Sequence, residues 1–458
     1  MKRITHKCII IGLVLSLVLI FTLAVQGADK PVLRTLVFQG WARTPSLQKQ
    51  VEEYEKLTGI KVEIEEVPFS QFHEKMIIDF ASKAGTYDFI GTLTDWFSEL
   101  VRGEYIIPID DYIKNDPPED WPNTFPQALL NLQSKDGKLY GFPTHDGPIM
   151  LYYRKDLFED PKEKEAFKEK YGYELQPPKT WAQFLDMAIF FNRPDQNLNG
   201  TVIAAKQGGQ QLAYDFYLML WSFGGDIFDE NWKPIFNSQA GIDGLQYYAD
   251  LRNKWGVTPK ASTTYDETES GPIYLEGRAA LMWHWSHIAS WAEMEDRSKI
   301  IGKNGYTVFP VADPNIPHTT LDIHWFFAIS SASKNQDETY KLVKWLCNKE
   351  NDKEAAFMGT VACRLSTFHD PDVLEKFPFY SGIEAALAGE AKTTPQIAEY
   401  AQVDDLIGIA CSKVIAGEKT AKEALDEAAK QVAGCLVYTS DAPDELRCVA
   451  LLRSRLIK

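Results

Sequence analysis

The sequence predicts an α/β fold with more than one lobe, and three features of its 458 residues support this. Apolar strand-like runs alternate with amphipathic helical patterns between Leu36 and Gly91. A stretch punctuated by Gly and Pro, from Asp136 to Phe158, is typical of a chain that crosses between lobes. A strand-like run within Leu275 to Trp291 ends in clustered tryptophans and histidines. With 45% hydrophobic residues, a chain of this length can bury a large core.

The first three predicted strands are separated by two helices. The strands cover residues 36–38, 60–64 and 87–91. We expect the first helix to have Thr44 as its N-cap, Pro45 at its first position and Gly59 at its end. The second helix carries an apolar face, formed by Phe72, Met76 and Phe80. Strand, helix, strand, helix, strand predicts a parallel, doubly wound sheet.

Ligands of such sheets bind beyond the carboxyl ends of the strands, so the residues that follow the strands are candidate contacts. Those after the first and third strands are Gln39, Trp41, Arg43, Asp95 and Trp96. The alternative for each is a loop or capping residue. At the predicted crossing, the candidates are His145 and Asp146.

The stretch LEGRAALMWHWSHIASW, from Leu275 to Trp291, is the most informative part of the chain. Ala279 to Met282 has the character of a buried strand, and aromatic and polar side chains follow at its end. Aromatic faces cover the C–H surface of a sugar ring, while polar groups bind its hydroxyls. The alternative is a tryptophan-rich core strand. We expect ligand contacts from Trp285 and His287 first, then from Trp283 and Ser286, and packing from Trp291.

The N-terminus has the pattern of a secretory signal peptide. Three basic residues precede an apolar run from Cys8 to Val25, and small residues then predict cleavage near Gly27 or Ala28. An uncleaved membrane anchor is the alternative. The net charge of −16 becomes −19 when the three basic residues of the leader are removed, which argues against nucleic acid as a partner.

The cysteines show no metal-ligand spacing. Cys347, Cys363 and Cys411 are compatible with one disulfide and one buried thiol. The C-terminal helix has a capping box of Thr420 and Glu423, and we expect it to end at Gly434. Residues 435–458 do not continue the preceding pattern and resemble translated adapter sequence, a genuine extension being the alternative.

Taken in order, many segments resemble an extracellular solute-binding protein of ABC importers, from the family that includes maltose-binding protein. The segments are Tyr54–Pro68, Tyr87–Gly91, Tyr105–Ile113, Asp136–Phe158, Pro177–Trp181, Ser222–Phe228, Phe236–Ser238, Glu276–Trp283, Gly305–Val311 and Phe327–Leu346. The resemblance spans nearly the whole chain after the leader.

This resemblance implies two α/β lobes, each a mostly parallel sheet flanked by helices, joined by several crossings with the ligand between them. The N-lobe would comprise residues 29–144 plus 318–359, and the C-lobe residues 147–308 plus 364–434. The crossings would lie near His145, residues 309–317 and residues 360–363. Family positions also make candidates of four further residues, namely Gly225, His324, Trp325 and Arg364.

The implied function is a periplasmic receptor that captures a sugar, oligosaccharide or polyol and delivers it to an ABC permease. We expect a monomer without a cofactor or resident metal, and no enzymatic activity, because no catalytic motif is present. Asp195 to Gly200 opens like a calcium loop, but Lys206 occupies its twelfth position, which favours a plain turn. The alternatives are a secreted carbohydrate-active enzyme and a receptor for iron, an amino acid or another solute.

Overall fold

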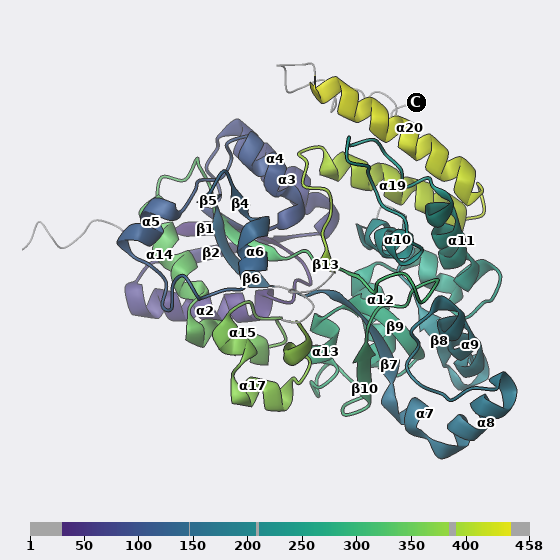
Figure 1. Ribbon diagram of the computed structural model, residues 1–458. Coiled ribbons are helices and arrows are strands. Elements are labelled where there is room, and N and C mark those ends of the chain that lie inside the picture. The colour runs from purple at the N-terminus through teal and green to yellow at the C-terminus, as the bar shows by residue number, and fades with distance from the viewer. Residues whose placement is uncertain (1–29, 146, 208–209, 384–390, 441–458) are drawn as a thin grey trace, which may run out of the picture.

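The computed structural model describes residues 30–145, 147–207, 210–383 and 391–440. Two separate sheets organise these residues (Figure 1). The predicted signal peptide, Asp146 and residues 441–458 of the tail lie outside the described residues. Within the described residues, no helix has the length and apolar character needed to cross a membrane.

The first sheet has five strands in the order β2-β1-β3-β12-β6. They are β1 (Leu33–Phe38), β2 (Val62–Val67), β3 (Phe89–Leu93), β6 (Gly141–His145) and β12 (Trp325–Ile329). The predicted parallel unit is confirmed, because β1 pairs in parallel with both β2 and β3. β12 runs antiparallel between β3 and β6, so the other four strands share one direction and β12 opposes them. A strand that returns from a distant part of the chain gives no directional signal in its own residues.

The second sheet has four strands in the order β10-β7-β9-β8. They are β7 (Ile149–Arg154), β8 (Asn199–Val202), β9 (Ala279–Trp285) and β10 (Asn304–Thr307). Among the neighbouring pairs, only β8 and β9 are parallel, because β7 is antiparallel to both of its neighbours, β10 and β9. We call the elements around the first sheet the first lobe and those around the second sheet the second lobe.

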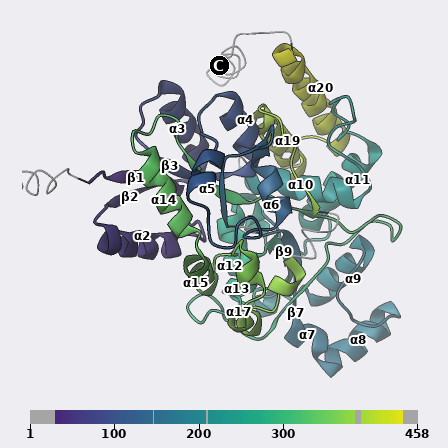
Figure 2. The same cartoon turned by 60° about the vertical axis from the view of Figure 1, so that its left-hand side comes forward.

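Helices cover both sheets (Figures 1 and 2). Those of the first lobe are α2 (Thr44–Thr58), α3 (Phe69–Ser82), α4 (Phe97–Arg102), α5 (Asp110–Asn115), α6 (Gln127–Leu132), α14 (Gln336–Leu346) and α15 (Lys349–Phe357). Those of the second lobe are α7 (Lys155–Glu159), α8 (Pro161–Tyr171), α9 (Trp181–Phe191), α10 (Gln210–Ser222), α11 (Gln239–Asn253), α12 (Glu267–Leu275), α13 (His287–Trp291), α19 (Tyr400–Ile415) and α20 (Ala421–Ser440). α20 lies along α19 in both views, and α19 packs on α10 and α11.

The chain passes between the two sheets more than once. β6 ends at His145 in the first sheet and β7 begins at Ile149 in the second. The return runs from β10 to β12, and it includes β11 (Thr320–Leu321), which pairs with β13 (Ala391–Lys392). Between α15 and β13 lie α16 (Leu365–Phe368) and α17 (Pro371–Lys376). The residue-level lobe boundaries given above stay a prediction.

Local signals placed some helix ends correctly and others wrongly. Gly59 ends α2 with a left-handed φ of 72°, although Thr44 is the first helical residue and Arg43 is the N-cap. The capping box of α20 is present, since Thr420 Oγ1 accepts a hydrogen bond from the Glu423 N–H. The expected end at Gly434 is wrong, because α20 continues to Ser440. A glycine inside a helix costs only about 1 kcal/mol and does not force an end.

Candidate functional site

A cavity of about 590 Å³ lies between the two lobes, where the carboxyl ends of β1, β6 and β9 meet. On the first lobe, it is lined by the loop that follows β1, the start of α3 and the end of β6. On the second lobe, it is lined by the start of α12, by α10 and by β9 with α13. Ligand pockets have volumes of about 300–1,000 Å³, so the cavity can enclose a small solute.

The structure brings six of the predicted site residues together in this cavity. They are Gln39, Trp41, His145, Trp285, His287 and Trp325. Four tryptophans line it in all, because Trp291 joins them. The rings of Trp41 and Trp325 lie 5.2 Å apart between centroids. Trp41 fits there because residue 91 is glycine: a Cβ at that position would lie 2.5 Å from the indole.

The orientation of Trp285 is fixed by a chain of buried hydrogen bonds. Its indole N–H donates to Gln211 Oε1 at 2.7 Å, and Gln211 Nε2 donates to Asp215 Oδ1 at 2.8 Å. The hydroxyl of Tyr248 donates to the other carboxylate oxygen of Asp215. Since the polar edge of Trp285 is occupied, the face of its ring is what this residue offers to a ligand.

His145 is held in one neutral form. The Trp41 indole N–H, which can only donate, lies 2.9 Å from His145 Nδ1, so Nδ1 accepts and the proton resides on Nε2. Burial, together with the nearby Arg43 guanidinium, lowers the pKa of His145 to about 3. Burial also lowers the pKa of His287, whose ring centroid lies 6.3 Å from that of His145. Both rings are therefore uncharged hydrogen-bonding groups at neutral pH.

The two predicted arginines lie away from the cavity and stabilise the fold. Arg43 is 1% exposed, and its guanidinium donates to Thr144, Ser46 and Gln50 and to a backbone carbonyl. Arg364 is equally buried and donates to the carbonyl oxygens of Cys347 and Glu119. Since these guanidinium groups already have partners, the geometry gives neither arginine a ligand contact.

Two predicted aromatic contacts are instead packing residues. Trp283 is 3% exposed and packs against Trp181 and Phe184; it shares a face of β9 with Trp285 but precedes it by two residues, so it lies farther from the strand end. Trp96 packs against His73 and beneath Trp325.

Three further candidates also lie outside the cavity lining. His324 is fully buried, with Nε2 3.1 Å from Gln133 Oε1. Gly225 lies against Leu220, and a Cβ there would be 2.4 Å from that side chain. Ser286 lies beside Gly147, where a Cβ would be 1.8 Å from its hydroxyl. Gly147 has a φ of 152°, so this close approach at the crossing requires glycine.

Asp95 connects the two lobes instead of lining the cavity. It is the middle residue of the short 3₁₀ helix η1 (Thr94–Trp96) of the first lobe. Its Oδ2 accepts a 2.5 Å hydrogen bond from the hydroxyl of Tyr214, on α10 of the second lobe, and its Oδ1 accepts one from Thr394. Burial raises the pKa of Asp95 to about 6. We call these three residues the interlobe clasp.

An acidic corner of the cavity was missed by the sequence analysis. Asp266, Glu267 and Glu269, at the start of α12, line the cavity together with Lys206. The signal available was the sequence DETE just before a helix, which reads as ordinary helix capping. Trp291, interpreted as packing, lines the cavity and also packs: its indole donates to the Gly359 carbonyl and Arg297 lies 4.3 Å above its ring.

The structure shows the state of the three cysteines, of possible metal ligands and of the turn at Asp195. Cys347, Cys363 and Cys411 are buried thiols and form no disulfide in the described part of the chain. Among residues 30–145, 147–207, 210–383 and 391–440, no group of three or more His, Cys, Asp or Glu is arranged to hold a metal ion. Asp195 and its neighbours form η2 (Pro194–Gln196) and a turn at Asn197.

Two lobes around a cavity lined by tryptophans define a solute-binding architecture, and comparisons with known proteins give the family. The family model for bacterial extracellular solute-binding proteins matches residues 40–353, and the chain belongs to this family. The chain is 28% identical over 398 residues to a "Probable ABC transporter-binding protein" from Deinococcus radiodurans, with 85% of this chain and 89% of that protein covered.

Two solved structures extend the likeness over almost the whole chain. A solute-binding protein from Agrobacterium radiobacter in complex with ribitol matches with a TM-score of 0.79 and 25% identity, and covers 88% of this chain and 98% of its own. Maltose-bound MalE3 from T. maritima matches with a TM-score of 0.78 and 25% identity, covering 88% and 100%. The two-lobed α/β fold predicted from the sequence is confirmed.

Proposed function

We propose that this protein is the binding component of an ABC importer, which captures a sugar, oligosaccharide or polyol in the interlobe cavity and delivers it to a membrane permease. The observation that carries the proposal is the cavity lined by four tryptophans from both lobes. Indole faces cover the C–H surface of a polyol, and the neutral imidazoles beside them exchange hydrogen bonds with hydroxyls. Ribitol and maltose, bound by two similar proteins, belong to this ligand class.

The charges of the cavity favour this ligand class over acids. Among its described lining residues there is no arginine, and Lys206 is the one lysine. Amino acids and organic acids need a cation to pair with their carboxylate, because an unpaired buried charge costs several kcal/mol. A hydroxylated ligand without a carboxylate needs no such partner.

Export and hinge closure complete the proposal. The leader predicts secretion to the periplasm with cleavage near Gly27 or Ala28, and a monomer fits the role of a diffusing receptor. Ligand contacts from both lobes are complete only when the lobes are together, so binding favours the closed arrangement. Residues 29–144 plus 318–359 and residues 147–308 plus 364–434 would then move as the two rigid parts.

A thermal-shift screen across solute classes tests the proposal. Sugars, oligosaccharides and polyols are compared with amino acids, ferric chelates and organic acids, and the melting temperature should rise only in the first group. Stabilisation equals RT ln(1 + [L]/Kd), or about 2.7 kcal/mol at a ligand concentration of 100 Kd. A rise with another class alone would contradict the proposal. Recovery of the sugar unchanged after incubation distinguishes the receptor from a carbohydrate-active enzyme.

A further inference from the structure

The acidic corner at the start of α12 has one carboxylate that takes no part in capping the helix and whose side-chain hydrogen-bond partner is the Trp285 indole. Asp266 caps the helix, its side chain accepting from the Glu267 N–H. Glu269 completes the capping box, accepting from the Asp266 N–H at 2.8 Å. The side chain of Glu267 has no part in either cap, yet it lines the cavity. The requirements of the helix terminus therefore account for two of the three carboxylates and leave the third unexplained.

Glu267 occupies an unfavourable place for a carboxylate. Burial, together with the negative charges of Asp266 and Glu269, raises its pKa to about 8, although the hydrogen bond from Trp285 acts in the opposite direction. Burial raises the pKa of Asp266, and the nearby ammonium of Lys206 partly offsets this rise. The carboxyl of Glu267 thus has no cation of its own within the described residues that line the cavity. A positive group on a ligand would supply one.

One ring nitrogen of His284, near Glu267, is free to accept a hydrogen bond. His284, which also lines the cavity, places Nε2 3.1 Å from the Glu267 carbonyl, so Nε2 carries the proton and Nδ1 is left as an acceptor. This Nδ1 is buried and has no hydrogen-bond partner in the described structure. Burial lowers the pKa of His284 to about 4, so the ring stays neutral. An ammonium group has three donors and no acceptor, which matches this arrangement.

Aromatic faces complete the surroundings of this corner. Trp285 and Trp291 line the same cavity from β9 and α13, and both are only partly buried. A cation near the face of an indole gains about 0.5–2 kcal/mol from the ring quadrupole. Carboxylate, bare imidazole nitrogen and indole faces are all suited to a positive group, whereas the three carboxylates of the acidic corner would repel an anion.

We infer that the Glu267 corner is a subsite for a protonated amine, so that the cavity takes an amino-bearing sugar or polyol in preference to its neutral analogue. This inference rests on the proposed function. The amine would lie beside the Glu267 carboxylate, while the hydroxyls and C–H faces of the same ligand meet the histidines and tryptophans. The preference would arise from one charged hydrogen bond, worth about tenfold or more in affinity.

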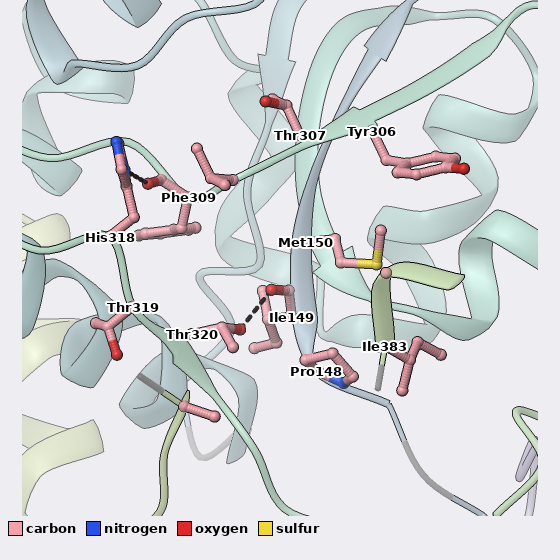
Figure 3. A pocket seen from close by; sticks show the side chains of 13 residues that line it. Pro148, Ile149, Met150, Tyr306, Thr307, Phe309, His318, Thr319, Thr320 and Ile383 are labelled. Atoms are coloured by element: carbon pink, nitrogen blue, oxygen red, sulfur yellow. Dashed lines mark hydrogen bonds between the residues drawn. The ribbon is translucent and has the colours of Figure 1, made fainter. Parts of the chain in front are cut away.

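A second cavity among the described residues carries no comparable inference. It has a volume of about 330 Å³ and lies beside the crossings, against β7 and β10 (Figure 3). Its lining is largely apolar, and two of its polar groups are already paired: Thr320 Oγ1 donates to the Ile149 carbonyl, and His318 Nδ1 lies 2.8 Å from the Phe309 carbonyl. Nothing in its lining indicates a particular occupant.

Calorimetry with matched ligands tests the inference. Each set holds a neutral sugar, its 2-amino-2-deoxy form and its uronic acid, such as glucose, glucosamine and glucuronate, and the corresponding galactose and mannose sets. The amine should bind about tenfold or more tightly than its neutral analogue, and the acid most weakly. If the neutral sugars bind as tightly as the amines or more tightly, the inference is overturned while the proposed function stands. If no member of any set binds but another solute class does, the proposed function fails.

A charge-removing variant locates the preference. Glu267→Gln should bring the affinities for an amine and its neutral analogue to within about twofold of each other. Glu276→Gln, at the exposed end of the same helix where Glu276 pairs with Arg278, removes one charge outside the cavity and should keep the wild-type ratio. If Glu267→Gln keeps the wild-type ratio between the affinities for the amine and its neutral analogue, the assignment of Glu267 to the amine subsite is overturned. The wild-type titrations decide the inference even if that variant fails to fold.

Discussion

The interlobe clasp predicts that a single hydroxyl contributes to ligand affinity without contacting the ligand. Tyr214→Phe removes the 2.5 Å hydrogen bond from α10 to Asp95 and leaves the ring in place, where it packs edge-on against Trp285. The hydroxyl bridges two lobes, so the lost bond weakens the arrangement in which both lobes meet the ligand. The expected result is a higher Kd with unchanged ligand selectivity.

The size of this effect follows from the burial of the clasp. A hydrogen bond to a charged group contributes about 1.5–3 kcal/mol, and Asp95 is only 1% exposed. If the bond forms only in the closed arrangement, Kd should increase about 10- to 100-fold in calorimetric titrations.

Tyr400→Phe is the matched control for this substitution. It removes a hydroxyl that donates to Asp404 at 2.8 Å within α19, inside one lobe. It should lower the melting temperature and leave Kd unchanged. The reasoning is refuted if Tyr214→Phe binds ligand as tightly as the wild type, or if both variants weaken binding equally.

The remaining predictions concern separate parts of the molecule. Burial raises the pKa of Asp95 to about 6 in the folded protein, from about 3.9 in the unfolded chain, so folding favours the protonated carboxyl. The protonated carboxyl of Asp95 therefore stabilises the fold fully below about pH 4, and this stabilisation is lost as the pH rises through about 6. Relative to Asp95→Asn, the wild type should therefore lose roughly 2 kcal/mol of unfolding free energy between pH 4 and pH 7 in urea titrations, and a constant difference would contradict this. Trp285→Ala should raise Kd about thirtyfold, or about 2 kcal/mol, whereas Trp232→Ala at the surface should not change it; equal affinities for both variants would exclude Trp285 as a contact. Thr420→Ala should cost about 1 kcal/mol of unfolding free energy and Thr420→Ser much less, because the serine hydroxyl preserves the capping box of α20. Burial raises the pKa of Cys347 to about 12, so iodoacetamide followed by peptide mapping should label Cys347 only after denaturation, and native labelling would show that its surroundings open.

Periodicity and turn signals were sufficient to predict the first three strands and the helices between them. Apolar spacing and glycine are local properties, so α2 and α3 could be predicted from their own residues. The antiparallel course of β12 could not, because its place between β3 and β6 depends on segments far away in the chain.

The site was only partly predictable for the same reason. Trp41 and Trp285 were found because they follow strand ends, which meet at the edge of a sheet. Arg43 also follows a strand, but its partner Leu346 is more than 300 residues away, and only the folded structure shows that its guanidinium is occupied. Glu267 was missed because a carboxylate at a helix start has a local explanation.

Isothermal titration calorimetry of the protein with a panel of sugars, oligosaccharides and polyols tests the central claim most directly. At least one of them should bind with a single site per chain, and Trp285→Ala should weaken that binding about thirtyfold. Micromolar affinity, corresponding to about −8 kcal/mol, is within reach of stacked tryptophans and several hydrogen bonds. Absence of heat across the panel, with saturable binding of a non-carbohydrate solute, would contradict the account.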